Sequence, residues 1–238
     1  SDVHQGEYVA ACDERLSWLT GFTGSAGICV VGEDRAGIFV DGRYSIQARK
    51  QTKSPFEVIQ WDKKNFFHWI EKNIVKGKIG FDPWLHSHKE IFSLSEEFAN
   101  SGISFAPSDN LIEKVWINRP AKTSNKVMKY PVELAGLSAR EKCQKIAEKI
   151  RFRKANSAVI TLPDSIAWLL NLRGNDVIHN PILHAFLIID SGGHIKIFSR
   201  NEILSNYIND LKDFVKVYPV ESFETTLAEL TGSVLMDE

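Results

Sequence analysis

Two kinds of hydrophobic pattern alternate along the first half of the chain. Residues 28–31 and 36–40 are short apolar runs separated by a polar turn, which predicts a β-hairpin. Residues 56–61 alternate apolar and polar side chains, which predicts another strand. Apolar side chains recur at helical spacing in 64–75 and 87–100, so these two segments are expected to be helices.

The same alternation of elements continues to the end of the chain. Ser138 and Glu141 have the spacing of a capping box and predict the start of a helix that ends near residue 154. Asp13 is expected to cap the first helix. The other expected helices cover 14–19, 44–52, 111–117, 165–172, 201–212 and 221–230, and the other expected strands cover 78–81, 103–106, 158–161, 183–190, 194–199, 214–218 and 234–236.

A polar segment without a period separates the two halves. Residues 121–136 contain Pro131 and are expected to link two domains, 1–120 and 121–238. Each half alternates helices and strands with a hairpin inserted. This pattern predicts an α/β fold with two domains, each a mixed β-sheet flanked by helices. The order helix, hairpin, helix, strand, helix, strand occurs in both halves and is consistent with an internal duplication.

Composition narrows the classes of partner. The chain has 29 basic and 30 acidic side chains and a formal net charge of -1, which gives no case for a nucleic-acid or anionic-membrane partner. No apolar run approaches the roughly 18 residues that span a bilayer. The three cysteines form no CxxC pair, so a reduced, cytoplasmic setting is expected. Cys29 lies in an apolar strand and is expected to be a small core residue.

The first candidate site is the stretch Asp41-Gly42-Arg43-Tyr44, which follows the second strand of the predicted hairpin. Asp41 can accept hydrogen bonds from the free N–H groups of a following helix. Arg43 would then project from the first turn at a strand end, where its guanidinium could bind a carboxylate or a peptide carbonyl. The alternative, which the residues leave open, is a solvated arginine with a surface partner.

Other polar stretches carry weaker signals. The Gly-rich segment 21–27 lacks the lysine of a P-loop and is interpreted as a turn. His86 and His88 are two imidazoles beside a helix start, and a metal site needs at least three ligands. The polar loop 173–181 contains His179 and could face a cleft, or its Asp and Asn residues could only organise the turn. No Ser/His/Asp triad, HExxH motif or pair of catalytic carboxylates can be placed.

Several longer motifs carry a resemblance to a known family. The motifs of the first half are HQGEY at 4–8, CDER at 12–15, LTGFTGSAG at 19–27, DGRY at 41–44 and WINRP at 116–120. In the second half they are DSIAWLLNLRGNDV at 164–177 and HNP at 179–181. Together these motifs resemble the N-terminal part of aminopeptidase P (Xaa-Pro aminopeptidase), and the resemblance spans nearly the whole chain.

The resemblance implies an enzyme built from two creatinase-like N-terminal domains and a C-terminal "pita-bread" catalytic domain. That catalytic domain holds two divalent metals, usually manganese, with two Asp, one His and two Glu, and activated water attacks the peptide bond before a penultimate proline. The chain ends before such a domain, so no catalytic residue, metal ligand or cofactor is expected in it. By this interpretation the chain is inactive alone, and its second domain is clipped near its last strand.

The resemblance also implies roles for this part of the enzyme. Arg43 matches an arginine of the DGRY motif that contacts the bound peptide, and Asp41 and Tyr44 would support it. Second-ranked candidates for substrate binding come from the loop that would face the catalytic domain; they are Arg173, His179 and Asn180. The two domains are expected to wall the active-site cleft and to support a cytoplasmic homodimer acting on peptides with penultimate proline.

Two other interpretations remain open at this stage. Creatinase-like domains also occur in non-catalytic proteins, so the chain could be a stand-alone binding module. Prolidase and creatinase are related hydrolases with similar N-terminal domains. The HQGEY and LTGFTGSAG stretches favour aminopeptidase P over both.

Overall fold

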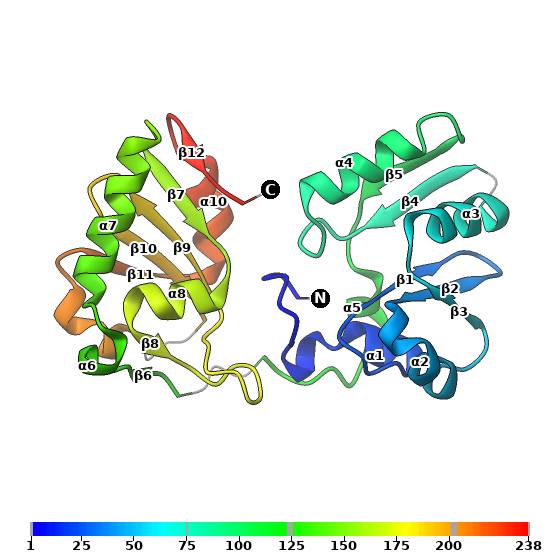
Figure 1. Ribbon diagram of the computed structural model, residues 1–238, viewed down its shortest axis with the longest axis horizontal. Coiled ribbons are helices and arrows are strands. Elements are labelled where there is room, and N and C mark those ends of the chain that lie inside the picture. Colours follow the sequence, from blue (N-terminus) through cyan, green and yellow to red (C-terminus); the bar gives the residue numbers. More distant parts are fainter. Residues whose placement is uncertain (1, 75, 123–125, 201–203, 238) are drawn as a thin grey trace. The chain divides into compact units, whose positions relative to one another are not determined.

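The computed structural model describes residues 2–74, 76–122, 126–200 and 204–237 (Figure 1). The chain divides into two compact units, the first running to Ala121 and the second from Lys122 to Asp237. Both units are mixed α/β structures, so the fold class expected from the sequence is confirmed. Of the described residues, none belongs to a helix long and apolar enough to cross a membrane.

The first unit is built around a three-stranded mixed sheet in the order β1-β2-β3. Strands β1 and β2 pair antiparallel, and β2 pairs parallel with β3. A second, two-stranded parallel sheet joins β4 and β5. The elements of this unit are η1 (Ala11–Asp13), α1 (Arg15–Thr20), β1 (Gly27–Val31), β2 (Ala36–Val40), η2 (Gly42–Tyr44), α2 (Ser45–Gln51), β3 (Phe56–Gln60), α3 (Lys63–Asn73), β4 (Gly77–Phe81), α4 (His88–Glu97), β5 (Ile103–Pro107) and α5 (Leu111–Val115).

The central strand β2 is buried along its whole length because both faces of the sheet are covered. Ile38 and Val40 pack in one cluster with Phe22 and the α2 residue Ala48. Phe39 points to the other face, into the cluster formed with α3. This alternation follows from the two-residue period of a strand. The covered central strand gives the residues just after Val40 a rigid support.

The chain start and the end of the first unit are joined by charged side chains. Asp13 is buried and its Oδ1 lies 3.0 Å from Nη1 of Arg15 and 3.1 Å from Nη2 of Arg119. Glu113 Oε1 lies 2.7 Å from a guanidinium nitrogen of each arginine. The expectation that Asp13 caps the first helix is therefore wrong: Glu14 occupies the N-cap position of α1, and no side chain caps that end.

The second unit contains a five-stranded mixed sheet in the order β11-β10-β9-β7-β12. The second unit repeats the order of hairpin, helix and parallel strand that is found in the first unit. Here β9 and β10 form the hairpin, and β11, which follows a helix, pairs parallel with β10. The elements are β6 (Met128–Lys129), α6 (Val132–Ala135), α7 (Ala139–Phe152), β7 (Ser157–Ile160), α8 (Pro163–Leu170), β8 (Leu172–Arg173), β9 (Ala185–Asp190), β10 (Ile195–Ser199), α9 (Leu204–Tyr207), η3 (Asn209–Leu211), β11 (Val215–Pro219), η4 (Val220–Ser222), α10 (Phe223–Ala228) and β12 (Val234–Leu235).

Helices cover both faces of this sheet (Figure 1). On one face, Leu187 and Ile189 of β9 pack in the large core cluster with α7 and α8. On the other, Phe186 stacks on Phe223 of α10 at 4.5 Å between ring centroids. The expected capping box of Ser138 and Glu141 is present at the start of α7.

The second half differs from the expectation in two segments. The described residues of the expected linker 121–136 include β6 and α6, which the sequence did not predict, and β6 pairs with β8, with Met128 opposite Arg173. The expected helix over 201–212 is broken into α9 and the single turn η3, with Ile208 between them. Residues 201–203, the first part of that expected helix, and residues 123–125 of the expected linker lie outside the described residues.

Candidate functional site

The DGRY stretch lies at the carboxyl end of the buried strand β2. Asp41 follows Val40 directly and is the N-cap of η2, where its Oδ1 accepts a hydrogen bond from the Arg43 N–H at 2.9 Å. The neighbouring strand β3 runs parallel and ends at the same edge. Carboxyl ends of parallel strands are where α/β folds place binding groups. The local structure expected for Asp41 is thus present.

Arg43 is the exposed cation of this site. Its Nε donates to Asp41 Oδ1 at 2.8 Å, while 70% of its side chain remains exposed. Its guanidinium carbon lies 5.6 Å from the centre of the Tyr44 ring. The hydrogen bond from Arg43 holds the pKa of the Asp41 carboxyl below its usual range, and Asp41 raises the pKa of Arg43. The pair is therefore fully ionised near neutral pH.

Tyr44 ties the site to the Gly-rich loop. Its hydroxyl lies 2.9 Å from Ser25 Oγ, and its ring packs edge-on against the fully buried Phe22. A Cβ atom on Gly24 would lie 2.2 Å from the Phe22 ring and 2.9 Å from Tyr44 Cδ1. Glycine is therefore required at this position for sterics alone, since these contacts are far shorter than van der Waals distances.

Side chains of α2 fix the same loop. Gln51 Oε1 accepts from the Thr23 N–H at 3.1 Å, and Thr23 Oγ1 accepts from both Gln47 and Gln51. These hydrogen bonds hold the Gly-rich loop as a turn, which is the interpretation made from its sequence. Sequence reasoning did not single out these glutamines, or the contact of Ser25 with Glu7 at 3.4 Å, because each joins segments far apart in the chain.

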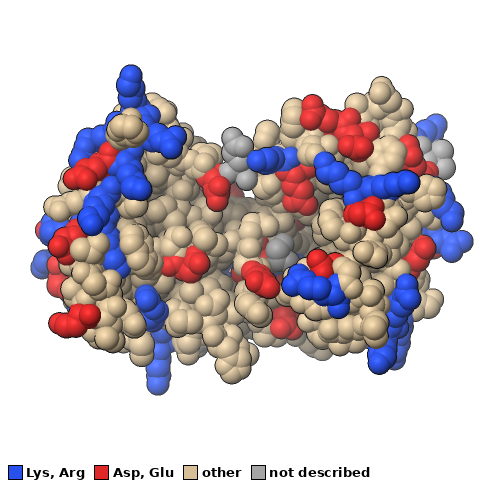
Figure 2. Space-filling model, viewed as in Figure 1, with Lys and Arg blue, Asp and Glu red and all other residues tan. Residues whose placement is uncertain are grey.

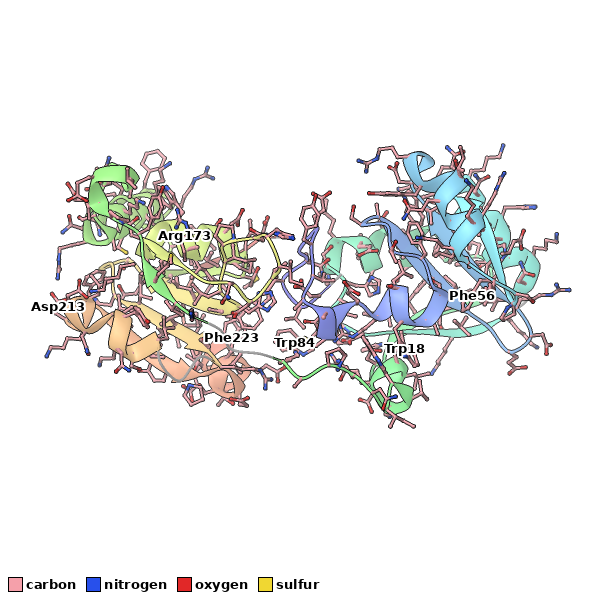
Figure 3. The ribbon with its side chains drawn as sticks, turned by 90° about the horizontal axis from the view of Figure 1, so that it is seen from below. Trp18, Phe56, Trp84, Arg173, Asp213 and Phe223 are labelled. Carbon is pink, nitrogen blue, oxygen red and sulfur yellow. The ribbon has the colours of Figure 1, made fainter. Side chains whose placement is uncertain are left out.

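The second-ranked residues belong to the second unit. Arg173, labelled in Figure 3, donates through Nη1 to the carbonyls of Ala167 and Leu172, and its guanidinium lies 4.1 Å from the Tyr130 ring centre. The hydrogen bonds from Nη1 of Arg173 hold the end of α8, and its guanidinium plane covers the Tyr130 ring. His179 is exposed at a tight turn with a φ of 62°, and Asn180 bridges back to Val177.

The remaining candidates for metal or thiol chemistry have structural roles. His86 Nδ1 lies 3.2 Å from Glu90 Oε2, one helical turn away. In the part of the chain that the structure describes, no group of three or more His, Cys, Asp or Glu side chains could hold a metal ion. Burial raises the pKa of Cys29 and of Cys143 to about 12, so neither is a reactive thiolate near neutral pH.

A surface cleft of 630 Å³ lies elsewhere in the first unit, where β4 and β5 end. Its lining residues are Asp82, Pro83, Trp84 (labelled in Figure 3), Pro107, Ser108, Asp109, Asn110, Glu113 and Lys114. Asp82 accepts from the Trp84 N–H and from Asn110, and Asp109 pairs with Lys114 at 2.9 Å. These carboxylates hold the turns that form the cleft, so we assign no ligand to it.

The chain belongs to the creatinase/prolidase N-terminal domain family. Two profiles described as Creatinase/Prolidase N-terminal domain match it, one over residues 8–115 and the other over residues 118–238. The two matches together cover almost all of both units. The recognition made from the sequence motifs is confirmed.

Two similar curated proteins are described as probable Xaa-Pro aminopeptidases P. The chain is 41% identical over 194 residues to the probable Xaa-Pro aminopeptidase P of Ajellomyces dermatitidis, covering 79% of this chain and 31% of that protein. It is 36% identical over 237 residues to the corresponding protein of Coccidioides posadasii, covering 97% of this chain and 36% of that protein. The chain thus spans about a third of the length of these relatives.

A solved structure shows the same fold. The X-prolyl aminopeptidase from Caenorhabditis elegans, described as a cytosolic enzyme with a di-nuclear active site, matches 96% of this chain and 38% of its own. The TM-score is 0.87 at 29% sequence identity.

Proposed function

We propose that this chain is the non-catalytic N-terminal part of a Xaa-Pro aminopeptidase, a hydrolase that removes the N-terminal residue from peptides with proline second. The observation that carries the proposal is the TM-score of 0.87 to the X-prolyl aminopeptidase of Caenorhabditis elegans, over 96% of this chain. The curated relatives of the same name support it at 36–41% identity. The two domains of the proposal are residues 1–120 and 121–238.

The proposal places the catalytic machinery outside this chain. Among the described residues, no set of three or more His, Cys, Asp or Glu side chains is arranged to hold a metal ion. The two divalent metals, proposed to be manganese, would supply activated water for hydrolysis. They would be held by the rest of the enzyme, so we expect the chain to be inactive alone. The Caenorhabditis elegans relative is described as having a di-nuclear active site, which supports the number of metals in the proposal.

Within the chain, Arg43 is the proposed peptide contact. Asp41 holds Arg43 through Nε, which leaves the terminal Nη edge for a peptide carbonyl or carboxylate. Tyr44 packs against the guanidinium and links the site to Ser25. Of the second-ranked residues, His179 is exposed and Asn180 is half-buried, so both are available to a ligand. Arg173 uses Nη1 on two carbonyls and ranks below them.

The proposal also gives the two domains a wider role in the whole enzyme. The two domains would wall the active-site cleft, limit access to peptides with a free N-terminus and support a homodimer. A cytoplasmic location is part of the proposal, and the cytosolic relative supports it. The three free cysteines agree with a reducing compartment.

Substitution of Arg43 tests the peptide contact. In the full-length enzyme, Arg43→Ala should raise KM for a Xaa-Pro peptide about tenfold with little change in kcat, because a charge-assisted hydrogen bond to the substrate is lost. Arg43→Lys keeps the charge but not the planar fork and should recover only part of the loss. Arg35→Ala, at an exposed arginine of the β1–β2 turn, is the control. Unchanged kinetics in Arg43→Ala would remove the proposed contact.

A further inference from the structure

The C-terminal end of α7 carries a dense group of cations around one exposed aromatic ring. We define this basic cluster as Lys149, Arg151, Arg153 and Lys154, which flank Phe152. All five side chains are exposed, and Phe152 is 85% exposed. The buried face of α7 is formed by other positions, among them Ala147 and Ile150. Figure 2 shows a row of Lys and Arg side chains along the edge of the second unit where α7 lies.

The cations of the basic cluster are not neutralised by neighbouring carboxylates. Among the described residues, no Asp or Glu oxygen lies within 4.0 Å of a side-chain nitrogen of any of the four. Arg151 donates to the Ser191 carbonyl, which is uncharged. The cluster therefore presents four positive charges within six residues.

Helix electrostatics explain only part of this arrangement. Cations in the last turn of a helix are favoured by its macrodipole. That effect gives no reason for an aromatic ring to protrude among them. A protruding Phe flanked by Lys and Arg is the composition of segments that lie on lipid surfaces, where the ring enters the interface and the cations meet headgroup phosphates.

We infer that the basic cluster and Phe152 bind the surface of an anionic phospholipid membrane. The site is a convex helix end with a single aromatic ring. Single-stranded nucleic acids are bound in grooves with several stacking rings, and peptides are bound in grooves or at sheet edges. A lipid surface requires neither a groove nor a sheet edge nor several rings, so it fits this convex helix end best.

The near-zero net charge of the chain does not oppose this inference. At physiological ionic strength charges are screened beyond about 8 Å, so a membrane near α7 interacts with the basic cluster and not with the total charge. The expectation of no membrane partner was based on the total charge of the chain. In that total, acidic side chains elsewhere in the chain cancel the local excess of cations at the end of α7.

Vesicle co-sedimentation tests the inference. The 238-residue chain should sediment with vesicles containing about 30 mol% phosphatidylglycerol in phosphatidylcholine and not with phosphatidylcholine alone, and high salt should release it. The triple variant Lys149→Gln, Arg153→Gln, Lys154→Gln should bind on the order of a hundredfold more weakly, because each cation contributes about fivefold. Phe152→Ala should weaken binding about tenfold.

Matched variants serve as controls. Lys50→Gln, Lys53→Gln, Lys64→Gln removes the same charge from exposed positions of the first unit, and Phe92→Ala removes a Phe that is 55% exposed. Both controls should bind like wild type, and circular dichroism checks that every variant folds. Absence of binding to the anionic vesicles at low salt overturns the inference. So does equal loss in test and control variants, or binding to single-stranded nucleic acid or an acidic peptide in preference to vesicles.

Discussion

At the residue scale, the geometry of Arg43 depends on its neighbours. Asp41 uses one oxygen for both the Arg43 N–H and the Arg43 Nε, so backbone turn and side-chain direction are set by the same carboxylate. The pKa of Asp41 is lowered by this contact, so the carboxylate loses its charge only at a pH below its usual range. The orientation of Arg43 is therefore expected to be constant across physiological pH.

Gly24 is the second residue on which the site depends. Gly24→Ala should destabilise the first unit by about 1–3 kcal/mol, because the new Cβ overlaps the ring of Phe22, which is fully buried. Displacement of Phe22 and Tyr44 should also weaken peptide binding through Arg43. Urea denaturation measures the stability change.

Gly32→Ala is the control for this substitution. Its nearest contact would be the Arg35 carbonyl oxygen at 3.4 Å, an ordinary distance, and its φ is not in the left-handed region. Its unfolding free energy should stay near that of wild type. If Gly24→Ala is equally neutral, the packing account of the loop is wrong.

The site was only partly predictable at this scale. Asp41 as a cap followed from its position between a strand and a helix, which is local information. Glu7 and Ser25 reach the neighbourhood of Arg43 and Tyr44 through folding of the chain start and the Gly-rich loop. No spacing rule connects these segments, so the sequence did not single out either residue.

At the scale of elements, the chain start is held to α5 by the ion network of Asp13, Arg15, Glu113 and Arg119. Arg119 also donates through Nε to the Cys12 carbonyl at 2.7 Å. Arg119→Ala should destabilise the first unit by about 3 kcal/mol, because it leaves the buried Asp13 with fewer partners. Lys114→Ala removes an exposed pair with Asp109 and should cost less than about 1 kcal/mol. Equal effects in urea denaturation would contradict a structural role for the network.

The same network predicts a pH dependence. Hydrogen bonds from Arg15, and then from Arg119, hold the pKa of Glu113 below its ordinary value of 4.5. A depressed carboxyl pKa stabilises the fold above the unfolded-state value, and this contribution is lost as pH falls through the folded-state value. The unfolding free energy should therefore decrease below about pH 4.5. Glu113→Gln should be less stable at neutral pH and show a smaller decrease; an unchanged slope would contradict this assignment.

Periodicity predicted those elements whose stabilising contacts are local or buried. The strand at 36–40 was predicted with its observed bounds because all its side chains are apolar or small. Strand β6 was missed because it has only two residues, both exposed, and exists through pairing with β8. Asp13 was misassigned because its partner Arg119 lies far along the chain and overrides its capping propensity.

At the scale of the whole molecule, the proposed function divides catalysis and substrate handling between the rest of a longer enzyme and this chain. The chain spans about a third of its curated relatives, and its described residues hold no candidate metal group. Under the proposed function, this chain would act on catalysis by binding, positioning or excluding substrate. That role makes the proposal open to a direct kinetic test.

The most direct measurement compares hydrolysis of a Xaa-Pro-Yaa tripeptide and its Xaa-Ala-Yaa counterpart by the full-length protein and by the 238-residue chain. We predict that the full-length protein releases the N-terminal residue from the proline peptide far faster than from the alanine peptide. The chain alone should release it from neither peptide. Hydrolysis by the chain alone, or a full-length protein without preference for penultimate proline, would contradict the proposed function.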